Sequence, residues 1–130
     1  MQKQVEQVLQ FHRAVDSHVP AGPTALADTS IPEGRANLLA EELEEYRQAC
    51  RDGDPVAVAD ALTDQLYVLL GTFISHGMHE IAARLFDEVH RSNMSKLGPD
   101  GKPLLRADGK VLKGPHFSPP DLGAVLAGNG

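Results

Sequence analysis

The motif DGDP at residues 52–55 separates two long stretches in which apolar side chains recur at helical spacing. This arrangement predicts that a pair of helices forms the centre of the fold. The first stretch covers about residues 33–51 and the second about residues 55–76. Asp54 is a favourable N-cap residue, and Pro55 suits the first position of a helix. We therefore expect two consecutive antiparallel helices joined by a tight turn.

Two further helices are predicted around this pair. Residues 2–17 have apolar side chains at helical spacing, and HGMHE marks a turn before a helix at about 79–95. The stretch 19–32 holds three prolines and a glycine and is predicted to be an ordered loop. The second half of 55–76, QLYVLLGTFI, is apolar nearly all round and should be central and buried. Four helices with short connections predict an all-α, four-helix bundle.

The composition changes after Lys96. Residues 97–130 contain seven of the twelve glycines and five of the nine prolines. A short repeat, PDGKPLL followed by ADGKVLK, has an Asp-Gly turn signal in each copy. We predict a helical domain at 1–96 and an irregular arm at 97–130 with one small hairpin, packed on the bundle or on a partner subunit.

Charge and cysteine content exclude several classes of protein. The net charge is −6, of which residues 97–130 carry +1 and the other 96 residues carry −7. The acidic charge of those 96 residues argues against binding of a nucleic-acid polymer, which needs a basic surface. The single cysteine, Cys50, fits a reducing cytoplasm and is predicted to be a small core residue. No apolar run approaches the ~20 residues that span a bilayer, and MQKQVEQVLQ lacks the apolar region of a secretory signal. We expect a cytoplasmic protein without a membrane segment.

Four glutamates are crowded into EELEE at residues 41–45. Because a helix advances about 100° per residue, Glu41, Glu42 and Glu45 share one arc at the edge of the apolar face. Glu44 faces away, beside Arg47, and is predicted to form a solvated salt bridge. A charged helix surface is the ordinary interpretation of such a run. Three carboxylates at the edge of a core repel one another, however, unless a cation binds between them.

The next helix carries a second acidic pair. Asp60 and Asp64, in VADALTDQLYVLL, are four residues apart and share a helix face with apolar neighbours. Buried salt bridges are one explanation, but few basic residues lie on these two helices. Acidic stripes on consecutive antiparallel helices should face each other. Carboxylate oxygens without a thiolate favour Mg²⁺, with Mn²⁺ as the alternative.

These motifs, together with FHRAV, VHRSNMSK and ADGKVLKGP, resemble the all-α nucleoside triphosphate pyrophosphohydrolases, most of all the small MazG-like, dUTPase-related branch. The superfamily also includes the phosphoribosyl-ATP pyrophosphohydrolases. The resemblance covers nearly the whole chain. It implies hydrolysis of the α–β phosphoanhydride of a nucleoside triphosphate, such as dUTP or another dNTP, to the monophosphate and pyrophosphate. A homodimer or a dimer of dimers is expected by the same analogy.

The resemblance also implies roles for individual residues. The first family motif, Glu-Glu-x-x-Glu, falls on Glu41, Glu42 and Glu45, and the aspartate of the second falls on Asp64. The glutamate of the second motif falls on Ala61, and Asp60, one residue earlier, is expected to substitute for it. Glu42, Glu45, Asp60 and Asp64 would then bind the metal. Glu41 would position or deprotonate water, or would itself be a ligand.

Substrate contacts are expected from three regions. The end of the fourth helix would bind phosphate or nucleotide, and its candidates are Arg91, Asn93 and Lys96. Phe11, His12 and Tyr67 are candidates for stacking on the base, although aromatic residues at helical spacing more often belong to a core. Lys110 and Lys113 either close over the triphosphate or keep the arm solvated.

Two other classes remain open. Asp87 and His90 form a carboxylate-x-x-His pair, as in di-metal helical bundles, but such sites need that pair from two helices. The departure at Ala61 also leaves room for a catalytically idle, nucleotide-binding relative. The sequence does not give the preferred base or sugar.

Overall fold

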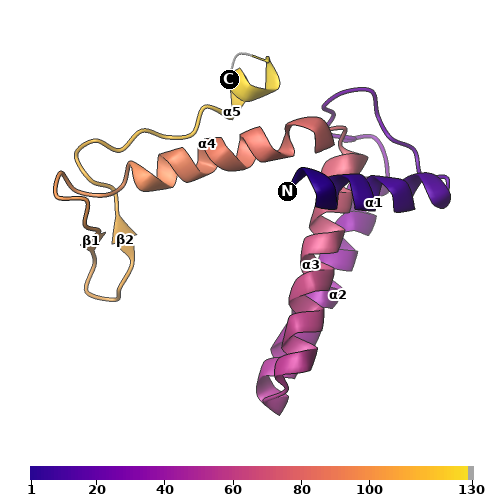
Figure 1. Ribbon diagram of the computed structural model, residues 1–130, viewed down its shortest axis with the longest axis horizontal. Coiled ribbons are helices and arrows are strands. Elements are labelled where there is room, and N and C mark those ends of the chain that lie inside the picture. Colours follow the sequence, from indigo (N-terminus) through magenta and orange to yellow (C-terminus); the bar gives the residue numbers. More distant parts are fainter. Residues whose placement is uncertain (129–130) are drawn as a thin grey trace. The chain divides into compact units, whose positions relative to one another are not determined.

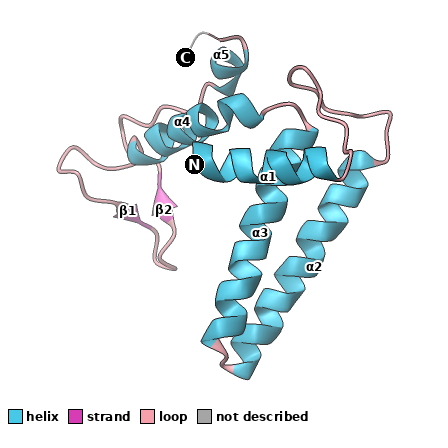
Figure 2. Cartoon of the chain, turned by 45° about the vertical axis from the view of Figure 1, so that its right-hand side comes forward, coloured by secondary structure: helices cyan, strands magenta, loops and turns pink. Residues whose placement is uncertain are grey.

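The computed structural model describes residues 1–128, and it confirms the all-α class (Figure 2). The helices are α1 (Gln2–Ala14), α2 (Ile31–Asp52), α3 (Pro55–Ser75), the short 3₁₀-helix η1 (His79–Ile81), α4 (Ala82–Met94) and α5 (Leu122–Leu126); the strands are β1 (Leu104–Leu105) and β2 (Val111–Leu112). The chain forms two compact units, Met1–Glu80 and Ile81–Gly130. The division into a domain at 1–96 and an arm at 97–130 stays a prediction.

The first unit is built on the predicted helical hairpin. Helices α2 and α3 run side by side in opposite directions (Figure 2). Gly53 ends α2 in the left-handed conformation, with φ of 67°. Asp54 then caps α3, because its Oδ1 accepts hydrogen bonds from the backbone N–H groups of Val56 at 2.9 Å and Ala57 at 3.1 Å. The DGDP turn therefore acts as the sequence predicts.

Helix α1 lies across α3 at the end of the hairpin away from that turn (Figures 1 and 2). Val5 and Val8 of α1 meet Leu70 and Ile74 of α3 in a buried apolar cluster. Four such side chains, each contributing roughly 1.5–3 kcal/mol on burial, fix α1 to α3. The end of the hairpin nearest α1 is thus the best-packed part of the unit.

The loop between α1 and α2 returns to the C-terminal end of α3. The backbone N–H of Thr24 donates to the carbonyl of His76 at 3.0 Å, and Nδ1 of His76 lies 2.7 Å from the carbonyl of Thr24. Gly77 has φ of 68°, and a Cβ at this position would lie 2.2 Å from the carbonyl oxygen of Gly22. The loop is thereby attached to α3 by backbone contacts.

Replacing Gly77 by alanine should destabilise the protein much more than the same change at Gly53. Both glycines have positive φ, which costs an alanine about 1–2 kcal/mol, but a Cβ at Gly53 meets nothing within 4 Å. At Gly77 the clash with backbone adds about 1–3 kcal/mol. Chemical denaturation of Gly77→Ala and Gly53→Ala measures the difference, and equal losses would show that the Gly22 contact does not constrain the loop.

Part of the predicted core is exposed. In the second half of α3, Leu66 is 50% exposed, and Tyr67 and Leu69 are also exposed. Cys50 is exposed too, so its assignment to the core is wrong. The reason is that α3 packs mainly against α2 and α1, which cover part of its circumference. Apolar character all round the helix therefore did not make it fully buried in one chain.

Helix α3 is also long and apolar enough to span a membrane, by length and composition alone. A single helix of this kind is weak evidence for insertion, because core helices of soluble proteins have the same character. Asp60 and Asp64 lie within it. A charged aspartate at the centre of a membrane helix costs roughly 2.5–3.5 kcal/mol.

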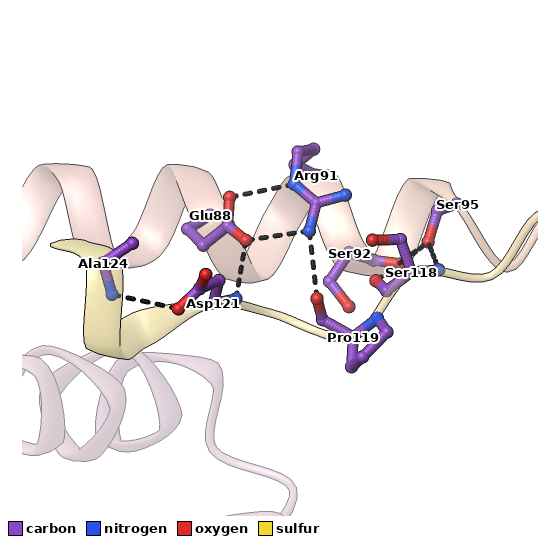
Figure 3. A network of polar contacts seen from close by, with 8 residues as sticks. All are labelled: Glu88, Arg91, Ser92, Ser95, Ser118, Pro119, Asp121 and Ala124. Carbon is purple, nitrogen blue, oxygen red and sulfur yellow. Dashed lines mark hydrogen bonds and ion pairs between the residues drawn. The ribbon is translucent and has the colours of Figure 1, made fainter. Parts of the chain in front are cut away.

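The second unit consists of α4 and the arm, which runs back along it (Figure 3). The backbone N–H of Ser118 donates to Oγ of Ser95 at 2.9 Å, and that of Asp121 donates to Oε1 of Glu88 at 2.8 Å. Arg91 contacts both Glu88, at 2.8 Å, and the carbonyl of Pro119, at 3.1 Å. The arm also contains α5, which was not predicted, although Asp121 ahead of LGAVL is an N-cap signal.

The two DGK copies of the repeat form the same turn. In the first copy, Gly101 has φ of 72° and donates to the carbonyl of Gly98, while Oδ1 of Asp100 accepts from the N–H of Lys102 at 3.0 Å. Gly109, Arg106, Asp108 and Lys110 repeat these contacts in the second copy. The second turn joins β1 to β2 in the predicted small hairpin, with Leu105 opposite Val111.

Acid should release the arm from α4. Hydrogen bonds from Arg91 and from the backbone of Asp121 lower the pKa of Glu88 to about 2. Because this pKa lies below the value in the unfolded chain, near 4.5, the stabilisation is present above pH 4.5 and is lost as the pH falls towards 2. The protection factor of the Asp121 amide, which is the exchange rate corrected for its intrinsic pH dependence, should fall over this window. In Glu88→Gln the exchange should be fast already at pH 7, and in the control Asp87→Asn it should stay slow; a slow amide in Glu88→Gln would contradict this prediction.

Candidate metal centre

Three carboxylates meet where α2 and α3 face each other. One oxygen from each of Glu42, Glu45 and Asp64 lies within 4.8 Å of the other two. Glu42 and Glu45 are three residues apart on α2 and so lie on one helix face, while Asp64 comes from the third turn of α3. The structure thus brings together the two acidic motifs at these positions.

Glu42 is a half-buried member of this cluster. Its Oε2 is buried and has no hydrogen-bond partner. Loss of hydration raises the pKa of Glu42, and the neighbouring charges of Glu45, Asp64 and Glu41 raise it further. Buried carboxylate oxygens are normally paired. An unpaired one among like charges is where a cation would bind.

The donor set fits a hard divalent cation. All three groups are carboxylates, and neither cysteine nor histidine belongs to the cluster. Oxygen ligands of this kind suit Mg²⁺, Mn²⁺ or Ca²⁺ rather than Zn²⁺ or Cu²⁺. Among residues 1–128, this is the one group of three or more such side chains close enough to share an ion.

Glu44 belongs to the solvated face, as predicted. It pairs with Arg51 at 2.9 Å and with Arg47 at 3.5 Å, and all three side chains are more than half exposed. Hydrogen bonds from these two arginines lower the pKa of Glu44. Glu42 and Glu44, two residues apart in one motif, therefore have pKa values that are shifted in opposite directions.

The other acidic candidates lie outside the cluster. Glu41 is exposed and stands next to Glu42 in the chain. Asp60 is exposed and lines a different cavity, of about 640 Å³, with Asp54 and Thr63. Ala61 is 2% exposed, so the position that the resemblance gives to a glutamate is part of the packed core. The roles expected of Glu41 and Asp60 stay predictions.

The three aromatic candidates do not form one group. Phe11 and Tyr67 are in edge-to-face contact, with ring centroids 6.1 Å apart, and both are exposed. Tyr67 lines a cavity of about 240 Å³ with Gln4, Gln7 and apolar residues of α1 and α3. His12 is buried and lines another cavity. Stacking of a base on Phe11 or Tyr67 stays a prediction.

The candidates on α4 and the arm already have partners within their own unit. Arg91 binds Glu88, and Nζ of Lys96 donates to Oδ1 of Asn93 at 2.8 Å. Lys113 lies over the ring of Phe117, 4.7 Å from its centroid. Lys110 contacts Asp108 through its backbone, and its side chain is exposed. Their roles in substrate binding stay predictions.

One cationic feature was missed by the sequence analysis. The guanidinium of Arg35 in α2 donates to the carbonyl of Val68 at 2.7 Å and to Oγ1 of Thr72 at 3.1 Å, both in α3. The signal was available in the sequence, because Arg35 precedes Glu42 by seven residues and therefore lies on the same face of α2.

Comparison with known protein families identifies a match to part of the chain. The sequence profile described as phosphoribosyl-ATP pyrophosphohydrolase matches residues 8–93, about two thirds of the chain. This family is part of the all-α MazG-like superfamily of nucleoside triphosphate pyrophosphohydrolases, and its members are typically dependent on a divalent metal. No curated protein matches the sequence. The matched region contains Glu42, Glu45 and Asp64.

Proposed function

The chain belongs to the phosphoribosyl-ATP pyrophosphohydrolase family, and we propose that it cleaves the α–β phosphoanhydride of a nucleoside triphosphate with the help of Mg²⁺. Family membership makes it a pyrophosphohydrolase that acts on a phosphoanhydride bond of a nucleotide. The observation that carries the finer proposal is the cluster of Glu42, Glu45 and Asp64 around the unpaired Oε2 of Glu42.

The chemistry assigns simple roles to the chain. Glu42, Glu45 and Asp64 would hold the ion; when bound, Mg²⁺ neutralises phosphate charge and acidifies a water. Glu41 is proposed to orient this water and to accept its proton. The water oxygen forms a new bond to phosphorus, the bridging P–O bond breaks, and pyrophosphate leaves with that electron pair. The products are the nucleoside monophosphate and pyrophosphate.

The test is release of pyrophosphate from a panel of nucleotides. The full chain with Mg²⁺, Mn²⁺ or no metal is incubated with dUTP, the other dNTPs, ATP and phosphoribosyl-ATP. We expect metal-dependent release of pyrophosphate and the matching monophosphate, and the panel identifies the preferred base and sugar. Release of single phosphates, or equal rates without metal, would contradict the proposal.

A catalytically idle relative is the alternative favoured by Ala61, which is buried and offers no ligand. Binding of nucleotides without turnover of any member of the panel would establish it. The di-metal alternative has less support, because Asp87 and His90 are exposed on α4 and neither belongs to the carboxylate cluster. Dioxygen consumption with bound iron, in the absence of nucleotidase activity, would decide in its favour.

We also propose that the protein is a cytoplasmic homodimer, or a dimer of dimers, in which a second copy covers α3. The exposed apolar side chains of the hairpin include Leu43, Leu62, Leu66 and Leu69. Together these residues form a larger apolar surface than the single, scattered apolar residues that are normal on a monomer. Sedimentation should show a dimer, and Leu62→Asp/Leu66→Asp should dissociate it. A monomeric wild-type protein would rule this out.

A further inference from the structure

A buried histidine lies at the contact between α1 and the helical hairpin. His12 is 6% exposed and is the one titratable side chain among the buried residues of α1. It borders a cavity of about 350 Å³ whose lining comes from α1, the residues after it, α2 and α3: His12, Ser17, His18, Ile31, Gly34, Arg35, Leu38 and Ser75. This lining contains no carboxylate, so no acidic side chain in the cavity balances a positive charge on His12.

Glycine at position 71 of α3 lets a cation approach this histidine. A Cβ there would lie 2.5 Å from Nη2 of Arg35 and 2.8 Å from Nε2 of His12. The two nitrogens therefore approach the same point on α3, one from α2 and the other from α1. Arg35 is held in place by hydrogen bonds to the carbonyl of Val68 and to Oγ1 of Thr72. Because a guanidinium does not lose its proton in proteins, His12 always has a positive charge beside it.

Hydrogen bonding also disfavours a charge on His12. Its Nδ1 is buried and has no hydrogen-bond partner. A neutral imidazole can leave this nitrogen without a proton, whereas an imidazolium carries a proton on both nitrogens. Protonation would therefore bury an N–H group that has no acceptor, which is costly. In agreement with this geometry, burial and then the charge of Arg35 lower the pKa of His12 from its ordinary value of 6.5.

The other titratable groups on the surrounding segments do not offset this repulsion. His18 lines the same cavity and also gains positive charge in acid. The remaining groups on these segments do not line the cavity, because they are exposed or contact another part of the loop: Arg13, Asp16, Glu33 and His76.

We propose that His12 is a pH-sensitive latch, which holds α1 on the helical hairpin while its imidazole is neutral and releases α1 when the imidazole is protonated. Release would separate the apolar cluster that α1 forms with α3, and Phe11 would leave Tyr67. The cavity that α1 forms with α3 beside Tyr67 would open at the same time. The latch is a property of the fold, and it does not depend on the proposed function.

The effect of pH has a definite sign. Below pH 6.5, the ordinary pKa of histidine, a released α1 binds a proton on His12 that the docked helix does not bind. The docked state therefore loses stability as the pH falls from 6.5 to the lowered pKa, and it loses no more below that value. Within this window, uptake of one proton on opening raises the opening constant by up to about tenfold per pH unit.

Amide exchange of α1 tests the latch in the full chain. Rates between pH 5 and pH 7.5, corrected for intrinsic exchange, give protection factors. We expect the protection of α1 to fall by up to about tenfold per pH unit below pH 6.5, while α2 and α3 beside the DGDP turn stay protected. The ring signals of His12 should titrate below pH 6.5. Constant protection of α1, an equal fall in all three helices, or a pKa of His12 at or above 6.5 would overturn the proposal.

His12→Gln separates the latch from other effects of acid. Glutamine gains no charge, so the protection of α1 should no longer fall with pH, whatever the substitution does to the absolute stability. Glu42 has a raised pKa and acts in the opposite direction, and comparison with this variant removes its contribution. His18→Gln, at an exposed position of the same cavity, should keep the wild-type slope. An unchanged slope in His12→Gln, or a lost slope in His18→Gln, would contradict the assignment to His12.

Arg35→Gln tests the source of the repulsion. Removing this charge should raise the pKa of His12 towards 6.5, because a like charge nearby disfavours protonation. The NMR titration of His12 measures this shift directly and does not require wild-type stability. His90→Gln, which changes an exposed histidine of α4, is the control and should leave the pKa of His12 unchanged. An unaltered pKa in Arg35→Gln would overturn the role of Arg35 in the latch.

Discussion

Asp64→Asn should abolish pyrophosphate release while leaving the helices intact. Asp64 is the one carboxylate that α3 contributes to the cluster with Glu42 and Glu45, and an amide cannot replace its charge. Even residues that only support a metal ligand contribute about 10–100-fold, so we expect a loss of at least ~100-fold in kcat/KM. Pyrophosphate release and far-UV circular dichroism measure the two effects.

The matched control for this variant is Glu44→Gln. It removes a carboxylate from the same EELEE motif, but from the face where Glu44 pairs with Arg47 and Arg51. Its turnover should stay within about twofold of wild type, because exposed ion pairs contribute roughly 0–1 kcal/mol to stability and this one does not touch the cluster. If Asp64→Asn retained the wild-type rate, the site would have to lie elsewhere.

Glu42→Gln should raise the melting temperature of the metal-free protein while removing its response to Mg²⁺. The burial of Glu42 and the charges around it raise its pKa in the folded state. The folded protein therefore binds this proton more tightly than the unfolded chain does. It follows that the metal-free protein is most stable below the unfolded pKa of Glu42 and becomes less stable as the pH rises through the folded pKa. At pH 7 the carboxylate opposes folding, and glutamine does not.

A bound cation should reverse this behaviour in the wild type. Mg²⁺ at 100 times its dissociation constant adds about 2.7 kcal/mol to the free energy of unfolding by mass action, and the gain should grow with pH as Glu42 ionises. Thermal melts of wild type and Glu42→Gln, with EDTA or Mg²⁺ at pH 5 and pH 7.5, measure both effects. A lower melting temperature for metal-free Glu42→Gln would show that the Glu42 carboxylate stabilises the fold.

Local chemistry explains why most elements were predictable. Asp54 and Pro55 start α3 through a side-chain cap and a fixed φ, and Gly101 and Gly109 turn the chain at positive φ. These effects need only neighbouring residues, as does the i, i+3 spacing that puts Glu42 and Glu45 on one face of α2. Helix α5 was missed because its five residues are too short to show a periodic pattern.

The errors concern burial, which depends on contacts between distant segments. The apolar second half of α3 and Cys50 were expected in a core, yet Leu66 and Cys50 are exposed, because α1 and α2 cover only part of the hairpin. Likewise, Asp60 and Asp64 share a helix face, but Asp64 joins the cluster and Asp60 lines a different cavity. Sequence spacing gives the direction of a side chain around the helix axis only to within about a quarter turn. The ligands of a metal ion must be positioned more precisely than that.

By itself, the sequence determined that this chain is all-α, that α2 and α3 form a hairpin, and that Glu44 is solvated while its neighbours border the core. Helical periodicity and charge pairing within one helix are sufficient for these conclusions. Only the tertiary structure decided which carboxylates meet and that Oε2 of Glu42 has no partner. It also placed Arg35 and His12 at Gly71. These features depend on how two helix faces pack together, because packing sets distances and removes water, and spacing along one helix does neither.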